Sequence, residues 1–328
     1  MRFCKNMDKI DLKIIKALLK NGRISTTQLA KRVRISRENT HYRMEQLTKK
    51  EIIREFVTQI NYRALGYIHH TVFLEYNKIT KEIEKELLYF LKNSVFVSWI
   101  GLLTGKWSIT FDIFTKKQKE IDSFLSDLLS KFQQSIKNYR IMQIADSNYY
   151  FEKLIASIHK MPMKKPEKKF KYDQQDIKII EKLNKNTRAK YTDIAKKLNL
   201  SANAIKIRIK KLEHSGLIQG YSVSLNHLAF GYEWQGIQIK IEIPNKAVER
   251  KIKSYVANNE KIIFLYHYTK TGMYDYDIGV LVRDSSELRE FINEFRTIFH
   301  DAARIEDTFL VLKEVSSHRL PSIIFKSD

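Results

Sequence analysis

The chain has 328 residues, 43% of them hydrophobic, which is too long for one ordinary core and apolar enough to fill two or more. Its single cysteine, Cys4, excludes a disulfide framework, and the most apolar stretch, residues 95–103, is about half the length of a membrane span. Residues 1–9 contain no apolar signal region, so the sequence predicts a soluble, cytoplasmic protein.

The net charge of +22 is distributed unevenly along the chain. Residues 1–56 carry 15 basic and 6 acidic side chains and residues 157–220 carry 17 and 6, whereas residues 57–156 carry 13 and 10. Residues 221–328 are nearly neutral, with 14 basic and 15 acidic side chains. Charge concentrated on two segments is typical of polyanion-binding modules. It favours double-stranded DNA over a membrane surface, because the basic segments lack the Trp and Phe face of an interfacial helix.

The two basic segments contain an internal repeat. Residues 8–53 and 173–218 align without a gap at an offset of 165, with 16 identities in 46 positions. A period of this length indicates two copies of a domain pair, because solenoid repeats are about 20 to 50 residues long. We call residues 1–156 the first copy and residues 172–318 the second copy.

Each repeated segment has the pattern of three short helices. In the first copy, apolar residues recur with helical spacing from Asp8 to Lys20, Thr27–Arg32 form a second helix, and Ser36 caps a third. The second copy repeats this plan over 176–183 and 192–198, followed by a helix that Ser201 caps. A turn of about four residues joins the last two helices, which predicts a helix-turn-helix, and the β-prone residues that follow predict a wing.

The third helix of a helix-turn-helix enters the major groove, so its outward side chains are the candidate DNA contacts. In the first copy these candidates are Ser36, Arg37, Asn39, His41, Tyr42 and Arg43. In the second copy they are Ser201, Asn203, Lys206, Arg208 and Lys210. Arg and Asn side chains can make bidentate contacts with guanine and adenine, whereas lysines bind phosphates as point charges. The third helix of the first copy therefore has side chains suited to reading bases, and that of the second copy has side chains suited to binding phosphates. The alternative is that both basic helix faces are only solvated surface.

A β-rich segment follows each helical module, with the order βαββαβ in both copies. In the first copy we expect strands and helices at 68–76, 81–91, 95–103, 107–114, 118–132 and 139–152. In the second copy we expect them at 234–243, 244–256, 261–269, 273–282, 285–299 and 303–314. This order predicts a ferredoxin-like α+β fold with helices on one sheet face. The apolar uncovered face should pack on a second sheet, which the other copy can supply within the chain as an intramolecular pseudo-dimer.

The fold class is therefore α+β, with two winged helix-turn-helix domains alternating with two ferredoxin-like domains. The expected boundaries are 1–60, 61–156, 157–171, 172–224, 225–318 and 319–328. Residues 157–171 form a lysine-rich linker with two prolines, which is either an extended, solvated connection or an arm that contacts phosphates. Residues 319–328 are expected to be a tail.

Several of these residues resemble the leucine-responsive regulatory protein and asparagine-regulator family of transcription factors. The resemblance rests on Leu200-Ser201, Arg208, Leu212-Glu213, Gly216-Leu217-Ile218, Gly220-Tyr221 and 228–231, together with 271–276. It covers nearly the whole chain twice and implies a DNA-binding regulator whose ferredoxin-like domain mediates dimerisation and binds a small effector, often an amino acid. Because this family often assembles further, a dimer of chains is also implied.

The effector residues implied by the resemblance surround a Thr-Gly loop. They are Thr271, Gly272, Tyr274 and Asp275 in the second copy and Thr104, Gly105 and Trp107 in the first. Ser108 stands where the second copy has Asp275, so the first copy lacks a carboxylate for an ammonium group. The first copy likewise has Glu51 where the second copy has Gly216 in the turn before the wing, which puts the tightness of that turn in question. A hairpin turn that binds no ligand is the alternative for both loops.

The same architecture also resembles siroheme decarboxylase subunits, some of which are fused in pairs. Those enzymes carry His-Asn-Tyr and Tyr-Asn-Leu-Trp runs around the equivalent hairpin, where this chain has His267-Tyr268 and Tyr274-Asp275-Tyr276. We find no catalytic constellation, no metal-ligand spacing around the histidines and no phosphate-binding glycine loop, so no cofactor is predicted. The sequence favours a regulator; the decarboxylase and a sequence-independent architectural DNA-binding protein remain as alternatives.

Overall fold

The computed structural model describes residues 7–150, 153, 171–242, 245–269, 273–316 and 319–326. The chain forms two compact units. The helical unit consists of residues 1–67, 161–229 and 318–328, and the barrel unit consists of residues 68–160 and 230–317. Thr271, Gly272 and the predicted linker, apart from Lys171, lie outside the described residues.

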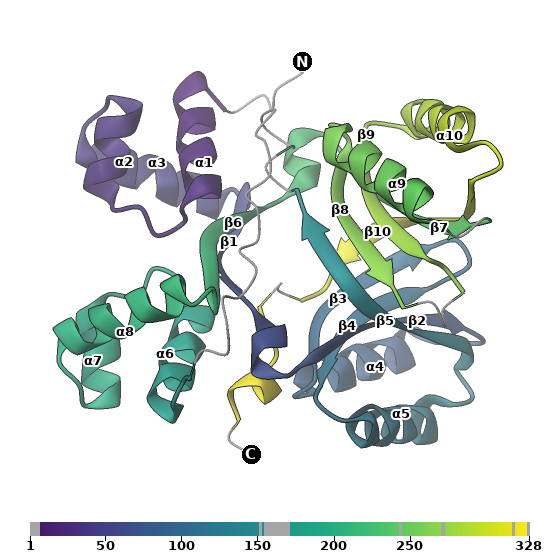
Figure 1. The fold of residues 1–328 in the computed structure, drawn as a ribbon, viewed down its shortest axis with the longest axis horizontal. Coiled ribbons are helices and arrows are strands. Elements are labelled where there is room, and N and C mark those ends of the chain that lie inside the picture. Colours follow the sequence, from purple (N-terminus) through teal and green to yellow (C-terminus); the bar gives the residue numbers. More distant parts are fainter. Residues whose placement is uncertain are drawn as a thin grey trace. The chain divides into compact units, whose positions relative to one another are not determined.

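The helical unit contains both three-helix modules (Figure 1). Those of the first copy are α1 (Lys9–Lys20), α2 (Thr26–Val33) and α3 (Arg37–Lys49), and those of the second copy are α6 (Gln174–Lys185), α7 (Tyr191–Leu198) and α8 (Ala202–His214). Asp8 and Asp173 begin α1 and α6 with a capping box, in which each side chain accepts a hydrogen bond from the amide of the third helical residue. The expected three-helix pattern is thus confirmed in both copies, with boundaries shifted by a few residues.

One strand follows each module, and the two strands pair with each other. β1 (Ile53–Ile60) and β6 (Ile218–Leu225) form an antiparallel two-stranded sheet in which Phe56 lies opposite Val223. Figure 1 shows this sheet between the two helical modules. The wing expected after each helix-turn-helix therefore takes the form of one sheet shared by the two copies. A short 3-10 helix follows each strand, η1 (Tyr62–Leu65) and η3 (His227–Phe230).

Hydroxyl groups on the shared sheet bind the ends of the opposite first helices. The Thr58 hydroxyl donates to the Leu183 carbonyl on α6 at 2.9 Å, and the Ser222 hydroxyl donates to the Leu19 carbonyl on α1 at 3.0 Å. These carbonyls lie in the last turn of a helix, where the helix itself offers no donor. Each strand thus completes the helical module of the other copy.

The turn between the third helix and its strand has the same left-handed backbone in both copies. Gly216 has φ +74°, and Glu51 at the equivalent position has φ +53°. The amides of Glu51 and Gly216 both donate to a carbonyl three residues earlier, at 3.0 and 3.2 Å. Glu51 therefore keeps the turn tight, at the cost of a conformation that strains a side-chain-bearing residue.

Residues 319–326 do not form the expected tail. They include the 3-10 helix η4 (Ser322–Phe325), in which the Ile324 side chain is 2% exposed. The Asn184 amide group on α6 donates to the Leu320 carbonyl at 3.0 Å, and the Tyr67 hydroxyl donates to the Ile323 carbonyl at 2.6 Å. The C-terminal segment is therefore part of the core of the helical unit.

The barrel unit contains the βαββαβ order of both copies. The first copy contributes β2 (Ile68–Tyr76), α4 (Lys81–Asn93), β3 (Val97–Thr104), β4 (Ile109–Thr115), α5 (Gln118–Phe132) and β5 (Ile136–Tyr149). The second contributes β7 (Glu233–Ile241), α9 (Lys246–Asn258), β8 (Ile262–Tyr268), β9 (Tyr276–Val282), α10 (Ser285–Phe299) and β10 (Ala303–Glu314). The strands close into a barrel in the order β10-β3-β4-β2-β5-β8-β9-β7. The two copies meet edge to edge, where β10 pairs with β3 and where β5 pairs with β8, so the second sheet is supplied within the chain by closure into one barrel.

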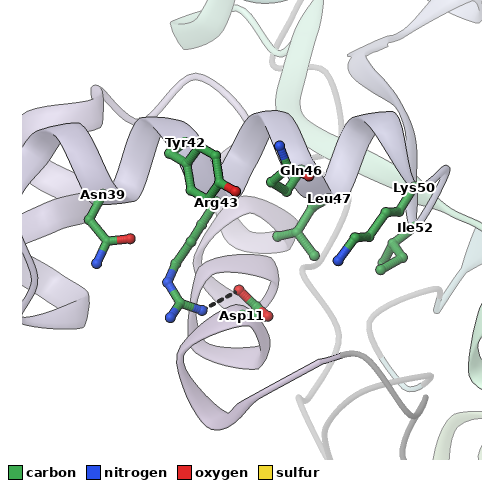
Figure 2. Close-up of a pocket in the computed structure, with 8 residues that line it drawn as sticks. All are labelled: Asp11, Asn39, Tyr42, Arg43, Gln46, Leu47, Lys50 and Ile52. Carbon is green, nitrogen blue, oxygen red and sulfur yellow. Dashed lines mark hydrogen bonds and ion pairs between the residues drawn. The ribbon is translucent and has the colours of Figure 1, made fainter.

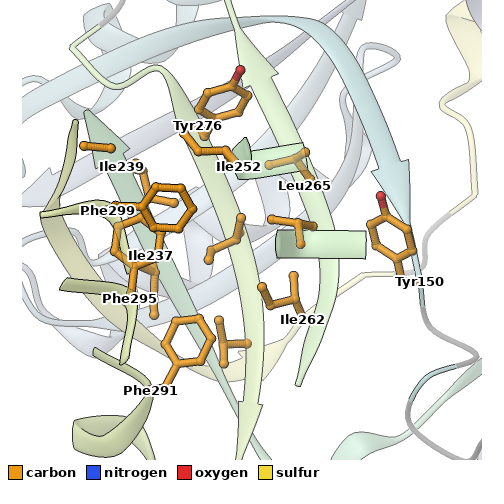
Figure 3. Packing of buried hydrophobic residues seen from close by; sticks show 14 of the residues in the cluster. Tyr150, Ile237, Ile239, Ile252, Ile262, Leu265, Tyr276, Phe291, Phe295 and Phe299 are labelled. Atoms are coloured by element: carbon orange, nitrogen blue, oxygen red, sulfur yellow. The ribbon is translucent and has the colours of Figure 1, made fainter. Parts of the chain in front are cut away.

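Two cores lie between the strands and the helices, and a third lies inside the barrel. On the second copy, Phe291, Phe295 and Phe299 of α10 pack against Ile237 and Ile239 of β7 (Figure 3). An equivalent cluster in the first copy lies beneath α4 and α5. The interior cluster draws on both copies, including Phe73, Trp99 and Trp107 from the first and Trp234, Phe264 and Phe309 from the second. Neither copy can bury its interior face without the other.

A polar network lies within the barrel. The Thr71 hydroxyl donates to Asp112 at 2.8 Å, and His69 Nε2 lies 3.2 Å from the other Asp112 oxygen. From the second copy, the Tyr268 hydroxyl donates to Asp277 at 3.2 Å. Burial raises the pKa of the Asp277 carboxyl well above its usual range, and the nearby Asp112 carboxylate raises it further despite the Tyr268 hydrogen bond. The Asp277 carboxyl is therefore harder to ionise in the folded chain than an exposed aspartate.

In the described part of the chain, no helix is long and apolar enough to cross a membrane.

The left-handed turns give a matched pair of stability tests. Glu51→Gly should raise the free energy of unfolding by up to about 1 kcal/mol, because glycine removes the strain at φ +53°. Gly216→Glu should lower it by about 1 kcal/mol at the equivalent position. Urea denaturation followed by circular dichroism measures both, and a destabilised Glu51→Gly variant would contradict the assignment of strain.

The buried acid gives a test with a defined pH direction. Because the pKa of the Asp277 carboxyl is higher in the folded chain than in the unfolded chain, its contribution to stability is full below the unfolded pKa of about 3.8 and declines as pH rises toward the folded pKa. Asp277→Asn should remove that decline, so the free energy of unfolding of the variant should gain on that of the wild type by on the order of 1 kcal/mol per pH unit over this range. Denaturation at pH 5 and pH 8 measures the difference; an identical pH dependence of the two proteins would contradict the raised pKa.

Candidate nucleic-acid interface

The third helix of each module is held by the same two backbone devices. Ser36 and Ser201 are N-caps, and their hydroxyl oxygens accept hydrogen bonds at 3.0 Å from the amides of Asn39 and Ala204. The preceding helices end at Arg34 and Asn199, both in the left-handed conformation, with φ +61° and +54°. A helix cap and a left-handed residue at these positions fix the angle between the two helices of the motif.

Arg43 and Arg208, which the sequence placed among the DNA contacts, form ion pairs within their own modules. In the first copy, Arg43 Nη1 lies 2.8 Å from both Asp8 and Asp11. Figure 2 shows the contact with Asp11. In the second copy, Arg208 Nη1 lies 2.8 Å from both Asp173 and Asp176. The Arg43 side chain is 23% exposed and that of Asp11 is 14% exposed. Each arginine thus ties the third helix to the start of the first.

The outward face of α3 presents the remaining candidates of the first copy. Arg37, Asn39, His41 and Tyr42 are all exposed, and Tyr42 is 60% exposed. Asn39 and Tyr42 line a groove of about 210 Å³ along α3, together with Asp11, Arg43, Gln46, Leu47, Lys50 and Ile52 (Figure 2). His41 also lies 3.5 Å from Glu45 one turn later. Amide, guanidinium and aromatic groups therefore stand together on a solvent-facing surface.

The corresponding face of α8 is simpler and more basic. Asn203, Lys206 and Lys210 are exposed as expected, and Lys211 is exposed beside them. The buried positions of α8 are Ile205, Ile209 and Leu212, which form its core-facing side. The helix therefore separates an apolar inner side from a basic outer side.

Two arginines join the modules across the shared sheet. Arg23 donates to the Thr187 carbonyl and, at 3.2 Å, to the Ala189 carbonyl of the second copy. Arg188, at the position equivalent to Arg23, donates to the Gly22 carbonyl of the first copy at 2.6 Å. Hydrogen bonds from a charged donor to buried carbonyls are stronger than neutral ones. We call this reciprocal exchange the arginine clamp.

The clamp residues also stack on aromatic rings. The Arg23 guanidinium lies 5.4 Å from the ring centre of Tyr191 and 5.3 Å from that of Tyr221, and Arg188 lies 5.2 Å from that of Phe56. Burial lowers the pKa of Arg188, and the neighbouring Arg23 charge lowers it further. Both guanidinium groups nevertheless keep fixed partners, so the spacing of the two helix-turn-helix motifs is set within the folded helical unit.

The described effector candidates divide into buried and exposed residues. Trp107 and Tyr274 have 0% exposure and belong to the interior of the barrel, where burial raises the pKa of Tyr274 to about 12. Thr104 and Gly105 are exposed at the end of β3, and Gly105 has φ +103°. Thr271 and Gly272 lie outside the described residues.

Asp275 already has protein partners. One of its carboxylate oxygens accepts a hydrogen bond from the Ile241 amide at 2.8 Å and lies 3.4 Å from Lys240 Nζ. Ser108 occupies the equivalent place in the first copy, where its hydroxyl oxygen accepts a hydrogen bond from the Tyr76 amide at 3.0 Å. The correspondence of Ser108 with Asp275 is therefore confirmed, and both side chains satisfy a backbone amide at the end of a strand.

No group of three or more His, Cys, Asp or Glu side chains suited to a metal ion occurs among the described residues.

Two sequence profiles match the helical modules. Residues 7–54 match a winged helix-turn-helix DNA-binding family, and residues 173–213 match the AsnC-type helix-turn-helix domain. An HTH-type transcriptional regulator of Pyrococcus horikoshii is 35% identical over 143 residues, which cover 93% of that protein and 44% of this chain. The chain belongs to the Lrp/AsnC family of transcriptional regulators. The regulator LrpA of Pyrococcus horikoshii is 32% identical over 123 residues, which cover 83% of LrpA and 37% of this chain.

These relatives each match less than half of the chain, as expected for a single Lrp/AsnC unit compared with a tandem pair. A solved structure with a match to nearly the whole chain is that of the siroheme decarboxylase NirDL, with a TM-score of 0.63 and 14% identity. The match covers 95% of this chain and 94% of the decarboxylase chain. At this identity the likeness shows a shared fold alone.

Sequence reasoning missed the arginine clamp and the acidic partners of Arg43 and Arg208. The signal was present, because Arg23, Asp8 and Asp11 all recur in the second copy at the offset of 165. A residue type kept in both copies while its exposed neighbours differ is a candidate for joining or bracing the modules. The sequence could not identify the partner of such an arginine, because arginine binds phosphates and carboxylates through the same guanidinium group.

A double-mutant cycle tests the bracing role of Arg43. Arg43→Ala and Asp11→Ala should each lower the free energy of unfolding, and the coupling energy between them should be about 1 kcal/mol, allowing for partial exposure. Arg208→Ala and Asp176→Ala should couple in the same way in the second copy. Urea denaturation of the single and double variants gives the cycle. Additive effects would mean that Arg43 is free for another role.

Proposed function

We propose that this Lrp/AsnC family member binds specific DNA sequences as a single-chain pseudo-dimer and regulates transcription at sites made of two unlike halves. The observation that carries the proposal is a pair of helix-turn-helix motifs that are joined by the arginine clamp and present different outward residues. A homodimer presents two identical reading helices to a palindrome, whereas this chain presents two unlike ones.

We assign base reading chiefly to α3. Arg37 and Asn39 are exposed near its start, where the residues of a recognition helix contact base edges. Arginine can bind guanine and asparagine can bind adenine through two hydrogen bonds each. His41, Tyr42 and Gln46 extend the same polar surface along the helix. The ion-paired Arg43 supports the helix in this proposal instead of touching bases.

We assign phosphate binding chiefly to α8. Lys206, Lys210 and Lys211 are exposed, and the one acidic residue of α8, Glu213, accepts a hydrogen bond from the Tyr221 hydroxyl at 2.7 Å. In α3 the residues equivalent to Lys206 and Lys210 are His41 and the acidic Glu45, whose side chains lie 3.5 Å apart. The second motif therefore has more uncompensated positive charge, which supports binding to the backbone of DNA.

Selection of bound sequences from a random DNA pool tests the proposal. We expect an enriched site with two different halves, and a large affinity difference between that site and random DNA at physiological salt. Enrichment of a palindromic site would contradict the proposal that the two half-sites differ. Equal affinity for all sequences would leave only the architectural role.

Substitutions on the two helices should have different signatures. Arg37→Ala or Asn39→Ala should cost about 1 to 3 kcal/mol on the selected site and relax the preference at one or two positions. Lys206→Ala should weaken the selected and random sequences alike and reduce the slope of log affinity against log salt by about 0.9. Fluorescence anisotropy across a salt series measures both. An unchanged slope for Lys206→Ala would contradict its phosphate contact.

We further propose that an amino-acid effector binds the second copy and not the first. Asp275 provides a carboxylate with one oxygen engaged by the Ile241 amide and Lys240, whereas Ser108 provides none. Isothermal titration with the common amino acids identifies a ligand. Its binding should be lost in Asp275→Asn and kept in Ser108→Ala; equal loss in both variants would contradict the assignment.

Catalysis is the second candidate, supported by the fold match to the decarboxylase over the whole chain. The described residues around its hairpin, His267, Tyr268 and Tyr274 to Tyr276, differ from the decarboxylase runs named above. Anaerobic incubation of the pure protein with siroheme separates the two candidates. The regulator assignment predicts no spectral conversion, and turnover would establish the enzyme instead.

A further inference from the structure

An apolar side chain stands exposed in the middle of the basic face of α8. Ile207 is 47% exposed. The other isoleucine and leucine side chains of α8 face the core and are buried; they are Ile205, Ile209 and Leu212. Single exposed apolar residues are ordinary on a protein surface. This one, however, lies on the third helix of the second motif, and it is not among the buried core residues of that helix.

The position of Ile207 relative to its neighbours follows from helical geometry. Asn203 lies one turn before it on the same side of α8, and Lys210 and Lys211 lie one turn after it, on either side. Asn203, Lys210 and Lys211 are also exposed. An apolar group is therefore framed by an amide and two ammonium groups on a solvent-facing surface.

The first copy places an apolar body at the same point of its own third helix. Tyr42 is equivalent to Ile207 at the offset of 165, and it is 60% exposed. Tyr42 and Ile207 are the large hydrophobic side chains exposed on α3 and α8 among the described residues. The two helices differ in nearly every other outward residue, yet both keep an exposed apolar group here.

We propose that Ile207 packs against the C5-methyl group of a thymine in the major groove, so that the second motif reads a base pair as well as binding phosphates. The major-groove edge of a base pair offers an apolar group only where thymine carries its methyl. An aliphatic side chain has no hydrogen-bonding group to offer the other base edges, and it loses exposed area when it meets this methyl. The lysines on either side bind the flanking phosphates and hold the isoleucine in the groove. This inference rests on the proposed DNA binding by α8.

Replacing thymine by uracil removes that methyl group and nothing else, so it isolates the contact. Each thymine of the selected site is replaced in turn by deoxyuridine, and the affinity of the full chain is measured by fluorescence anisotropy. For the wild type, we expect at least one replacement to weaken binding about three- to fivefold, the effect of one buried methyl. In Ile207→Ala, that replacement should have no effect.

Two control variants make the outcome specific. Lys206→Ala should weaken binding to the thymine and deoxyuridine duplexes equally and so keep the full deoxyuridine penalty. Tyr42→Ala should also keep the penalty at that thymine, because Tyr42 lies on the other motif. Circular dichroism checks that Ile207→Ala is folded, which is expected because alanine favours the helix more than isoleucine does.

The outcomes separate this inference from the proposed function. Specific binding with no deoxyuridine penalty above twofold at any thymine would overturn the contact and leave the regulator proposal intact. If every deoxyuridine penalty of the wild type survived in Ile207→Ala, the methyl contacts would belong to other residues, which would also overturn the inference. Absence of specific binding by the wild type would overturn the proposed function and the contact together.

Discussion

β1 and β6 hydrogen-bond along their length, and each strand comes from a different copy of the repeat. Because the strands follow directly on α3 and α8, this pairing brings the third helices of both modules into one folded unit. The arginine clamp lies on either side of the same sheet, with Arg23 and Arg188 each bound to carbonyls of the opposite copy. A two-stranded sheet is marginal by itself, so the helices and charged donors that cover it provide the necessary packing.

The duplication allows the two copies to differ where a homodimer could not. Gly22 lies so close to the shared sheet that a Cβ there would be 2.5 Å from the Ser222 carbonyl oxygen. The equivalent residue is Thr187, whose hydroxyl donates to the Phe56 carbonyl at 2.8 Å. There is thus no room for a side chain at Gly22, whereas the equivalent Thr187 uses its hydroxyl group to bind the sheet. A symmetric dimer would require a single residue to satisfy both environments.

The barrel is asymmetric for the same reason. His69, Thr71 and Asp112 of the first copy form part of a buried polar network, and the corresponding positions of the second copy hold Trp234, Gly236 and Gly279. The Phe264 ring fills the space beside Gly279, where a Cβ would meet a ring carbon at 2.1 Å. Each copy supplies polar and aromatic groups to the shared interior, but from different positions of its strands. Such an interior specifies pairing within the chain, since two identical faces would place the same groups at the same positions.

The sequence alone determined what depends on neighbours along the chain. Three kinds of pattern are local: helical spacing, the Ser36 and Ser201 caps, and the alternation of apolar and polar residues in strands such as 303–314. Helices α5 and α10 begin and end at the residues that the sequence predicts. The outward positions of α3 and α8 followed from the same periodicity, and Asn39, Tyr42, Asn203 and Lys206 are exposed as expected. These features reflect steric and capping preferences that act over a few residues.

Only the tertiary structure decided which distant groups meet. The pairing of β1 with β6, the closure of the barrel and the folding of 319–326 onto α6 join segments more than 110 residues apart. The partners of Arg43 and Asp275 were decided there too, because the composition of a side chain gives its charge and not its neighbour. The physical reason is that a local pattern fixes the face on which a side chain lies, whereas packing fixes what that face touches.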